Sequence, residues 1–287
     1  MRALARQKLF GHESSFYARN AQLFAGTGLE VGGPSGLFAV EGYAPVYAHA
    51  GRLDNVNFAH QTRWEGVIHA GDSFTFRAGC APGTQYLREA TDLQAIGDGT
   101  YDFLISSHML EHCANPMKAL REWQRVMRPD GTLILVLPHK DGTFDWRRPV
   151  TPLRHMIEDD ERDVGEDDRT HFDEVLRLHD LKRDIFQPSA EAFRTWVEGN
   201  TVNRGLHHHV FDSHSAARLV DHAGFEILCV EPAETESIFV FARKPQRGHV
   251  PRNEDFTSLR APFLKASPFP SDRRRARSGG NEESPAR

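Results

Sequence analysis

Short apolar runs that end in glycine or polar residues alternate with amphipathic stretches over most of the chain. This rhythm is typical of βαβ units, which build a parallel sheet. The clearest strands are expected at residues 28–31, 44–47, 103–106 and 132–137. A helix is expected between the last two, because Asn115 can cap it, Pro116 suits its first turn and Pro129 with Gly131 can end it. The pattern therefore predicts an α/β fold.

The pattern changes toward the end of the chain. A helix over residues 213–222, ended by Gly224, leads into two apolar strands at residues 225–232 and 237–245. These strands are expected to pair antiparallel at a sheet edge. Residues 141–206 carry helix signals but few strand signals, so we expect a helical cap over the strand ends. Thr170 to Asp173 fits a capping box that opens a helix running to about residue 182.

Three parts of the chain follow from this pattern. Residues 1–27 are expected to form an N-terminal helical segment, and residues 28–244 one domain with the cap inserted at 141–206. Residues 245–287 are rich in proline, serine, glycine and charge without periodicity, which predicts a largely disordered tail. A length of 287 residues suits a single α/β domain with insertions.

The composition limits the cellular compartment and the binding partners that we expect for this protein. Apolar residues make up 39% of the chain, and none of their runs approaches the roughly 20 residues of a membrane helix. The first residues lack the apolar stretch of a secretory signal, so a cytoplasmic location without membrane attachment is expected. Three widely spaced cysteines argue against a disulfide framework. The acidic stretch at residues 158–174 would repel phosphate backbones, which disfavours a nucleic-acid partner.

A glycine-rich turn, Gly32-Gly33-Pro34-Ser35-Gly36, follows the first expected strand. Nucleotide-like ligands bind at such turns in open α/β sheets. The dinucleotide pattern requires glycine where this chain has Pro34 and Leu37, and no Lys-Ser/Thr pair completes a phosphate-binding loop. A nicotinamide-dependent dehydrogenase and a P-loop protein are therefore disfavoured.

The same turn resembles the first motif of class I S-adenosylmethionine-dependent methyltransferases of the type 11 kind, which has the spacing Glu30-x-Gly32-x-x-x-Gly36. Residues 101–112 are similar to the fourth-strand segment of that family, residues 125–131 to the turn before its fifth strand, and residues 224–245 to its terminal antiparallel pair. Pro34 departs from the family, in which many members have a third glycine. The resemblance implies a Rossmann-like, doubly wound, mostly parallel seven-stranded sheet with an antiparallel terminal pair and a helical cap insertion.

The resemblance also implies S-adenosylmethionine as the cofactor. The glycine turn would hold its methionine end, a carboxylate past the second strand its ribose, and the segment after the third strand its adenine. Asp54 is the ribose candidate, because it lies about 20 residues beyond the turn as in dinucleotide folds. The implied cofactor-binding residues are Glu30, Gly32, Gly33, Ser35, Gly36, Asp54, Glu89, Ala90, Asp92, Ser107 and His108.

Histidines are the candidates for the reacting side. Methyl transfer to a hydroxyl requires alignment of the acceptor and removal of its proton, which histidine does best near neutral pH. His139 follows the fifth strand, and His207 and His209 would share a face of an extended segment. These three are the catalytic candidates, whereas His112 is expected to be structural.

Imidazoles and carboxylates of the cap suggest a divalent metal such as Mg, Mn, Fe or Zn. The candidate ligands are His139, Asp141, His171 and Asp168, although no short spacing such as HExxH fixes a site. A metal would acidify the acceptor hydroxyl. The alternative is a charged cap stabilised by ion pairs.

The leading hypothesis is O-methylation of a small molecule such as a sugar or a glycosylated natural product. Aromatic residues and arginines near the cap would suit such an acceptor. A metal-dependent hydrolytic or redox enzyme on the same fold, a binding module without turnover and a protein substrate remain alternatives, and a homo-oligomer is left open. Nucleic-acid methylation is disfavoured because the fourth strand ends in Ser106-Ser107-His108 rather than Asn/Asp-Pro-Pro-Tyr/Phe.

Overall fold

The computed structural model describes residues 13–233 and 235–278. Within them, an eight-stranded sheet has the order β5-β6-β2-β1-β7-β8-β10-β9. Strands β6, β2, β1, β7 and β8 run parallel, whereas β5 and β10 are antiparallel to their neighbours. The strands are β1 (Thr27–Val31), β2 (Arg52–Asn57), β5 (Gly71–Phe74), β6 (Gly83–Leu87), β7 (Tyr101–Ser107), β8 (Met127–Pro138), β9 (Glu226–Ala233) and β10 (Ser237–Arg243). A separate small pair joins β3 (Gln61–Thr62) and β4 (Gly66–Val67).

The predicted fold class is confirmed, including the antiparallel terminal pair. The eighth strand, β5, is the exception, because the family resemblance implied seven strands. Its residues are mostly exposed, so it lacks the buried apolar alternation by which a strand is identified in sequence.

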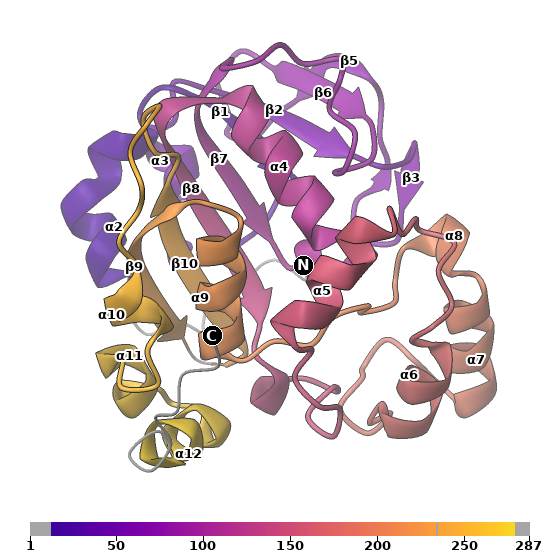
Figure 1. The fold of residues 1–287 in the computed structure, drawn as a ribbon. Helices are drawn as coiled ribbons and strands as arrows, with labels where there is room; N and C mark the ends of the chain where they lie inside the picture. The colour runs from indigo at the N-terminus through magenta and orange to yellow at the C-terminus, as the bar shows by residue number, and fades with distance from the viewer. Residues whose placement is uncertain (1–12, 234, 279–287) are drawn as a thin grey trace.

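Helices cover both faces of the sheet (Figure 1). One face carries α4 (Pro116–Val126) and α9 (Ser213–His222), and the other carries α2 (Ser15–Asn20), the 3-10 helix η1 (Ala21–Phe24) and α3 (Val46–His49). Successive side chains of β7 point to opposite faces, so Leu104 joins the core under α4 while Phe103 and Ile105 join the core under α2 and η1. This double covering explains why the central strands are apolar on both sides.

The helices predicted with clear end signals are confirmed. The side chain of Asn115 accepts the backbone N–H of Lys118 at the start of α4. Gly224, with φ +84°, follows α9 as expected for a helix C-terminus. Both helices were predicted because their capping residues agree with their apolar spacing.

Two local predictions are wrong. Residues 44–47 were expected to be a strand, but α3 begins at Val46 and the second strand begins only at Arg52. Pro45, which precedes α3, has no N–H to donate to a sheet and suits a helix start. The capping box at Thr170 is also absent, because the Thr170 hydroxyl donates to Asp168 at 2.7 Å.

The cap contains α5 (Leu153–Glu161), α6 (Phe172–Leu178), α7 (Ala190–Glu198) and α8 (Asn200–Asn203). It has a small core of its own, formed by Val175, Phe193, Val197 and Leu206. Figure 1 shows α6, α7 and α8 together at the lower right, beyond α5. The segment between the last parallel strand and the terminal pair is therefore helical, as its pattern predicted.

The segment expected to be a disordered tail instead forms three short helices over much of its length. They are α10 (Glu254–Thr257), α11 (Pro262–Ala266) and α12 (Pro270–Ser278), and residues 279–287 lie outside the described residues. Figure 1 shows these helices at the lower left, below β9. Leu264 is fully buried, and the ring of Phe269 stacks on that of His139 with centroids 3.8 Å apart. These few buried contacts order a segment whose composition alone indicated disorder.

At the other end, residues 1–12 of the expected N-terminal helical segment lie outside the described residues, and α2 and η1 follow them. None of the helices in the described part of the chain combines the length and the apolar character needed to span a bilayer.

Asp272 is expected to hold the C-terminal helices in place. Its fully buried carboxylate accepts from the Ser213 hydroxyl and the Ser267 hydroxyl, each at 2.6 Å, and lies 3.2 Å from Nε2 of His139. We expect Asp272→Ala to lower the free energy of unfolding by about 3 kcal/mol, because it leaves buried polar partners unsatisfied. Urea unfolding measures this change, and Arg277→Ala, on an exposed residue of α12, is the control. Equal stability of both variants would contradict the assignment.

Candidate functional site

The glycine turn is fixed at its base and open at its far end. Gly32 has φ +85°, and a Cβ there would lie 2.6 Å from Cγ of Met109, so the position requires glycine. The carbonyl of Gly33 accepts from Nδ2 of Asn55 and from Nδ2 of Asn57, each at 3.0 Å. Gly36 is exposed, and a Cβ there would meet no atom within 4 Å. Space for a ligand therefore remains beside Gly36.

Glu30 lies buried in β1 beneath this turn. Its carboxylate accepts from the Tyr47 hydroxyl at 2.7 Å and from the Ser35 backbone N–H at 2.9 Å. Burial raises the pKa of Glu30 to about 8, although these hydrogen bonds act to lower it. A carboxylate offers about four acceptor sites, so further donors can be accommodated. A cationic group bound here would favour the ionised form of Glu30.

This raised pKa predicts an effect of pH on stability. Glu30 has an ordinary pKa of 4.5 and a folded pKa of about 8, so between these values the folded protein keeps a proton that unfolding releases. Its favourable contribution is complete below the ordinary value and is lost as pH rises through the folded value. The free energy of unfolding of the wild type, measured relative to Glu30→Gln, is expected to fall by up to about 1.4 kcal/mol per pH unit in that window. If denaturant titrations gave the same dependence of the free energy of unfolding on pH for the wild type and for Glu30→Gln, the prediction would be contradicted.

Asp54, the predicted ribose ligand, lies inside β2 rather than at its carboxyl end. Its carboxylate accepts from the Tyr101 hydroxyl at 3.0 Å and the Thr84 backbone N–H at 2.8 Å, and it pairs with Arg52 at 2.9 Å. The residue at the end of β2 is Asn57. It was missed because a carboxylate was expected there, although an asparagine side chain also hydrogen-bonds hydroxyls.

The remaining predicted cofactor residues follow the ends of β6 and β7. Glu89 accepts from Arg204 at 2.6 Å, and the carbonyl of the buried Ala90 accepts from the Trp123 indole at 3.2 Å. The nearby Asp92 accepts from the backbone of Gln94. Ser107 ends β7, and His108 follows with φ +49° and with Nε2 3.1 Å from the Ser237 hydroxyl. With the glycine turn, these residues line the carboxyl edge of the parallel strands, where ligands of open α/β sheets bind.

The three catalytic candidates have different surroundings. His139 and His209 are each fully buried, and Nε2 of His209 lies 3.2 Å from the carbonyl of Ala114. His139 stacks on Phe269 beside Asp272 and so contacts the C-terminal helices. The His207 side chain, by contrast, remains 10% exposed. Of the three, His207 is the one that a bound acceptor can reach.

His207 forms a close pair with Asp145, with Nδ1 2.6 Å from Oδ2. Burial lowers the pKa of His207, but the charge and hydrogen bond of Asp145 outweigh it, so the pKa is raised overall. Arg148 lies 3.1 Å from the other oxygen of Asp145 and fixes its orientation. The ring of His112 packs edge-on against His207, with centroids 4.6 Å apart. His207 is thus an oriented base close to the segment that follows β7.

Glu111 is a functional candidate that the sequence analysis did not single out. It lies in the 3-10 helix η2 (Leu110–His112), is fully buried, and its carboxylate oxygens have no hydrogen-bond partner among the described residues. Burial raises its pKa to about 7, although the nearby His207 lowers it. Its position just after β7 was the available signal, but the groups around it, Asp145, His207 and Glu236, are distant in sequence.

The four predicted metal ligands do not lie in one group of possible ligands. Asp141 accepts from the backbone N–H of Ser271 at 2.7 Å, at the start of α12, and His139 contacts Asp272 from the same helix. Asp168 and His171 lie elsewhere, grouped with His208, with ligand atoms within 4.8 Å of one another.

Comparison with known proteins found a matching family model and several similar solved structures. A family model described as a methyltransferase domain matches residues 9–230. A methyltransferase structure from Aquifex aeolicus is 14% identical and has a TM-score of 0.39, covering 83% of this chain and 92% of that one. A putative methyltransferase from Bacillus halodurans is 15% identical, with a TM-score of 0.44 and coverage of 81% and 100%.

A third similar structure, the 1,6-didemethyltoxoflavin-N1-methyltransferase of Burkholderia thailandensis, is 14% identical with a TM-score of 0.43 and coverage of 80% and 76%. No curated protein matches the sequence. The family model spans most of the chain, and the resemblance seen in the motifs points the same way. The chain belongs to the class I methyltransferase family.

Proposed function

We infer that this chain transfers a methyl group from S-adenosylmethionine to a hydroxyl oxygen of a small molecule such as a sugar or a glycosylated natural product. Membership of the methyltransferase family supports the reaction type. The observation that carries the choice of oxygen is the His207–Asp145 pair, because a hydroxyl acceptor must lose a proton.

The residues at the carboxyl edge of the sheet fit this cofactor. Glu30 can accept from its ammonium group, the open space at Gly36 leaves room for its methionine end, and Asn57 can bind a ribose hydroxyl. Glu89, near the end of β6, is the candidate for its adenine amine. When bound, S-adenosylmethionine supplies an electrophilic methyl group.

His207 would act as the general base. Asp145 accepts a hydrogen bond from the N–H at Nδ1, which leaves the lone pair of Nε2 free to take the proton of an acceptor hydroxyl. As Nε2 takes up that proton, the carboxylate of Asp145 stabilises the resulting imidazolium. Glu111 adds a second acidic group close by, which also acts to raise the pKa of His207.

An aromatic side chain near this pair and a basic side chain near the end of β6 support a sugar acceptor. Trp64, in the turn between β3 and β4, is 51% exposed, and its ring centroid lies 5.7 Å from that of His112. Arg204 pairs with Glu89 and places its guanidinium 5.6 Å from the ring of Phe58. An exposed indole offers a face for the apolar side of a sugar ring, and a guanidinium binds anionic substituents.

Two measurements test the proposal. Calorimetry with S-adenosylmethionine on the purified full chain tests the cofactor, and failure to bind would refute it. Labelled methyl transfer is then assayed with sugars, nucleotide sugars and glycosides, each matched to a derivative whose hydroxyls are already methylated. Label is expected in the free sugars and not in the blocked ones. Transfer confined to amines or thiols would refute the choice of oxygen.

A further inference from the structure

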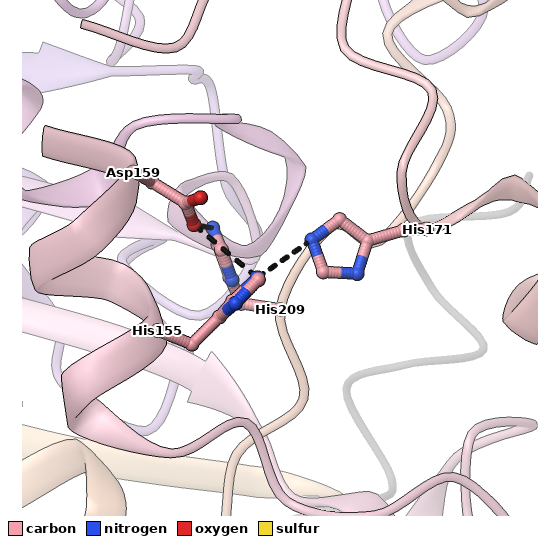
Figure 2. A group of neighbouring side chains, drawn as sticks. All are labelled: His155, Asp159, His171 and His209. Carbon is pink, nitrogen blue, oxygen red and sulfur yellow. Dashed lines mark hydrogen bonds and ion pairs between the residues drawn. The ribbon is translucent and has the colours of Figure 1, made fainter. Parts of the chain in front are cut away.

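A second group of histidines lies under the cap, separate from the His207–Asp145 pair. His155 and Asp159 stand four residues apart on α5 and so share one face of that helix. His171 comes from the residue before α6, and His209 from the extended segment that precedes α9. Figure 2 shows the four side chains converging from these three segments. Segments far apart in sequence therefore bring three imidazoles and one carboxylate together.

The spacing of the four side chains suits one shared ion. One nitrogen or oxygen atom from each lies within 4.8 Å of the others. Nε2 of His155 is 3.1 Å from Nε2 of His171 and 3.4 Å from Oδ2 of Asp159. The same Asp159 oxygen is 3.9 Å from Nε2 of His209. Metal–ligand bonds of about 2.0–2.1 Å in a tetrahedron place neighbouring ligand atoms about 3.3–3.4 Å apart. Small side-chain adjustments would bring all four within bonding distance.

One of the atoms that would face this ion is buried without a hydrogen-bond partner among the described residues. It is Oδ2 of Asp159, a residue only 6% exposed. A buried polar atom is rarely left unpaired, and an ion that binds to it is one cause.

We propose that His155, Asp159, His171 and His209 bind one divalent metal ion, and that the ion is zinc. Three imidazole nitrogens with one carboxylate oxygen form a set that zinc accepts in tetrahedral geometry. The ligand set carries a single negative charge when Asp159 is ionised, which a divalent ion compensates. Asp168 and His208 lie beside His171. Polar side chains in such positions orient an imidazole that binds a metal.

Such a site would join three parts of the chain. It would tie α5 and the start of α6 to the segment that carries His209. Four protein ligands fill a tetrahedral zinc ion, which is typical of a structural site rather than a catalytic one. The His155 side chain is 35% exposed, so the ion can be reached from solvent. The proposal does not depend on methyl transfer, because metal content and stability report on it directly.

The test uses the full chain purified without a histidine tag, loaded with zinc and then desalted. Elemental analysis is expected to find about one zinc per chain. Cobalt loading is expected to give the visible absorption of tetrahedral cobalt, and chelation to lower the Tm. His155→Gln and Asp159→Asn are expected to lose most of the bound metal. His155→Gln alters a partly exposed residue, so it also keeps the test valid if Asp159→Asn does not fold.

Two controls separate this site from others. His222→Gln changes an exposed histidine of α9 and is expected to keep the zinc. Glu111→Gln tests a rival group, Glu111, His112 and His207, whose ligand atoms also lie within 4.8 Å of one another. It too is expected to keep the zinc. Metal content that falls with Glu111→Gln but not with His155→Gln would overturn the proposal, as would a wild-type chain that retains no zinc and gives no tetrahedral cobalt spectrum.

Discussion

Replacing His207 with alanine is expected to lower kcat for methyl transfer by about 100- to 10,000-fold, the usual contribution of a general base. The acceptor hydroxyl would then have to lose its proton to water. Because His207 contacts Asp145 and His112 rather than the residues of the glycine turn, the Kd for S-adenosylmethionine is expected to stay within about twofold. Steady-state assays with labelled cofactor and calorimetry measure the two quantities on the same preparation.

Asp145→Asn tests the same base through its partner. The amide keeps the shape of the carboxylate but removes the charge that raises the pKa of His207. A lower kcat is therefore expected, together with a pH profile shifted to lower pH, since the histidine would become a weaker base. Loss of stability alone would change the amount of active enzyme but not the profile. Unchanged kcat in His207→Ala would exclude this histidine as the base.

Glu30→Gln is expected to raise the Kd for S-adenosylmethionine by about 10- to 100-fold. Removing the charge weakens a hydrogen bond to a cationic group, and such bonds contribute about 1.5–3 kcal/mol. The amide retains nearly the same volume, so the buried site under the turn stays filled. Calorimetry measures the change, and kcat at saturating cofactor is expected to be affected much less than Kd.

Tyr47→Phe is the matched control for Glu30. It removes the hydroxyl that donates to the carboxylate at 2.7 Å but leaves the carboxyl group itself in place. Its effect on the Kd is expected to be smaller than that of Glu30→Gln. Equal effects would show that the hydrogen bonds within the turn, rather than the charge of Glu30, govern binding. No effect of either change would place the cofactor elsewhere.

The sequence predicted those elements in which local signals agree. Around α4, the cap at Asn115, the proline at the first position and the apolar spacing all favour the same helix, which is confirmed. Residues 44–47 gave an ambiguous signal, because a short apolar run fits a strand or a helix and only Pro45 favours the helix. That error moved the expected second strand toward the N-terminus. Asp54 was chosen from its spacing to the glycine turn, and it lies inside β2, whereas Asn57 ends that strand.

The candidate site was harder to predict, because its pairs join distant parts of the chain. His207 was a candidate from its place in the sequence, but its partner Asp145 is 62 residues away and only the fold brings the two together. Glu111 likewise lies near Asp145, His207 and Glu236, which are distant from it in sequence. Asp272 was assigned to a disordered tail, because nothing in local composition shows that its carboxylate meets Ser213 and Ser267.

The C-terminal helices contact the same short stretch of backbone, residues 207–213, that carries the proposed base. Asp212, which caps α9, pairs with Arg275 of α12, and the neighbouring Ser213 donates to Asp272. His207 lies five residues before Asp212 on the same extended stretch. A chain that ends before α12 would lose the contacts of Asp272 and Arg275 with this stretch and would expose His139 to solvent. Truncated variants are therefore unsuitable for measuring catalysis.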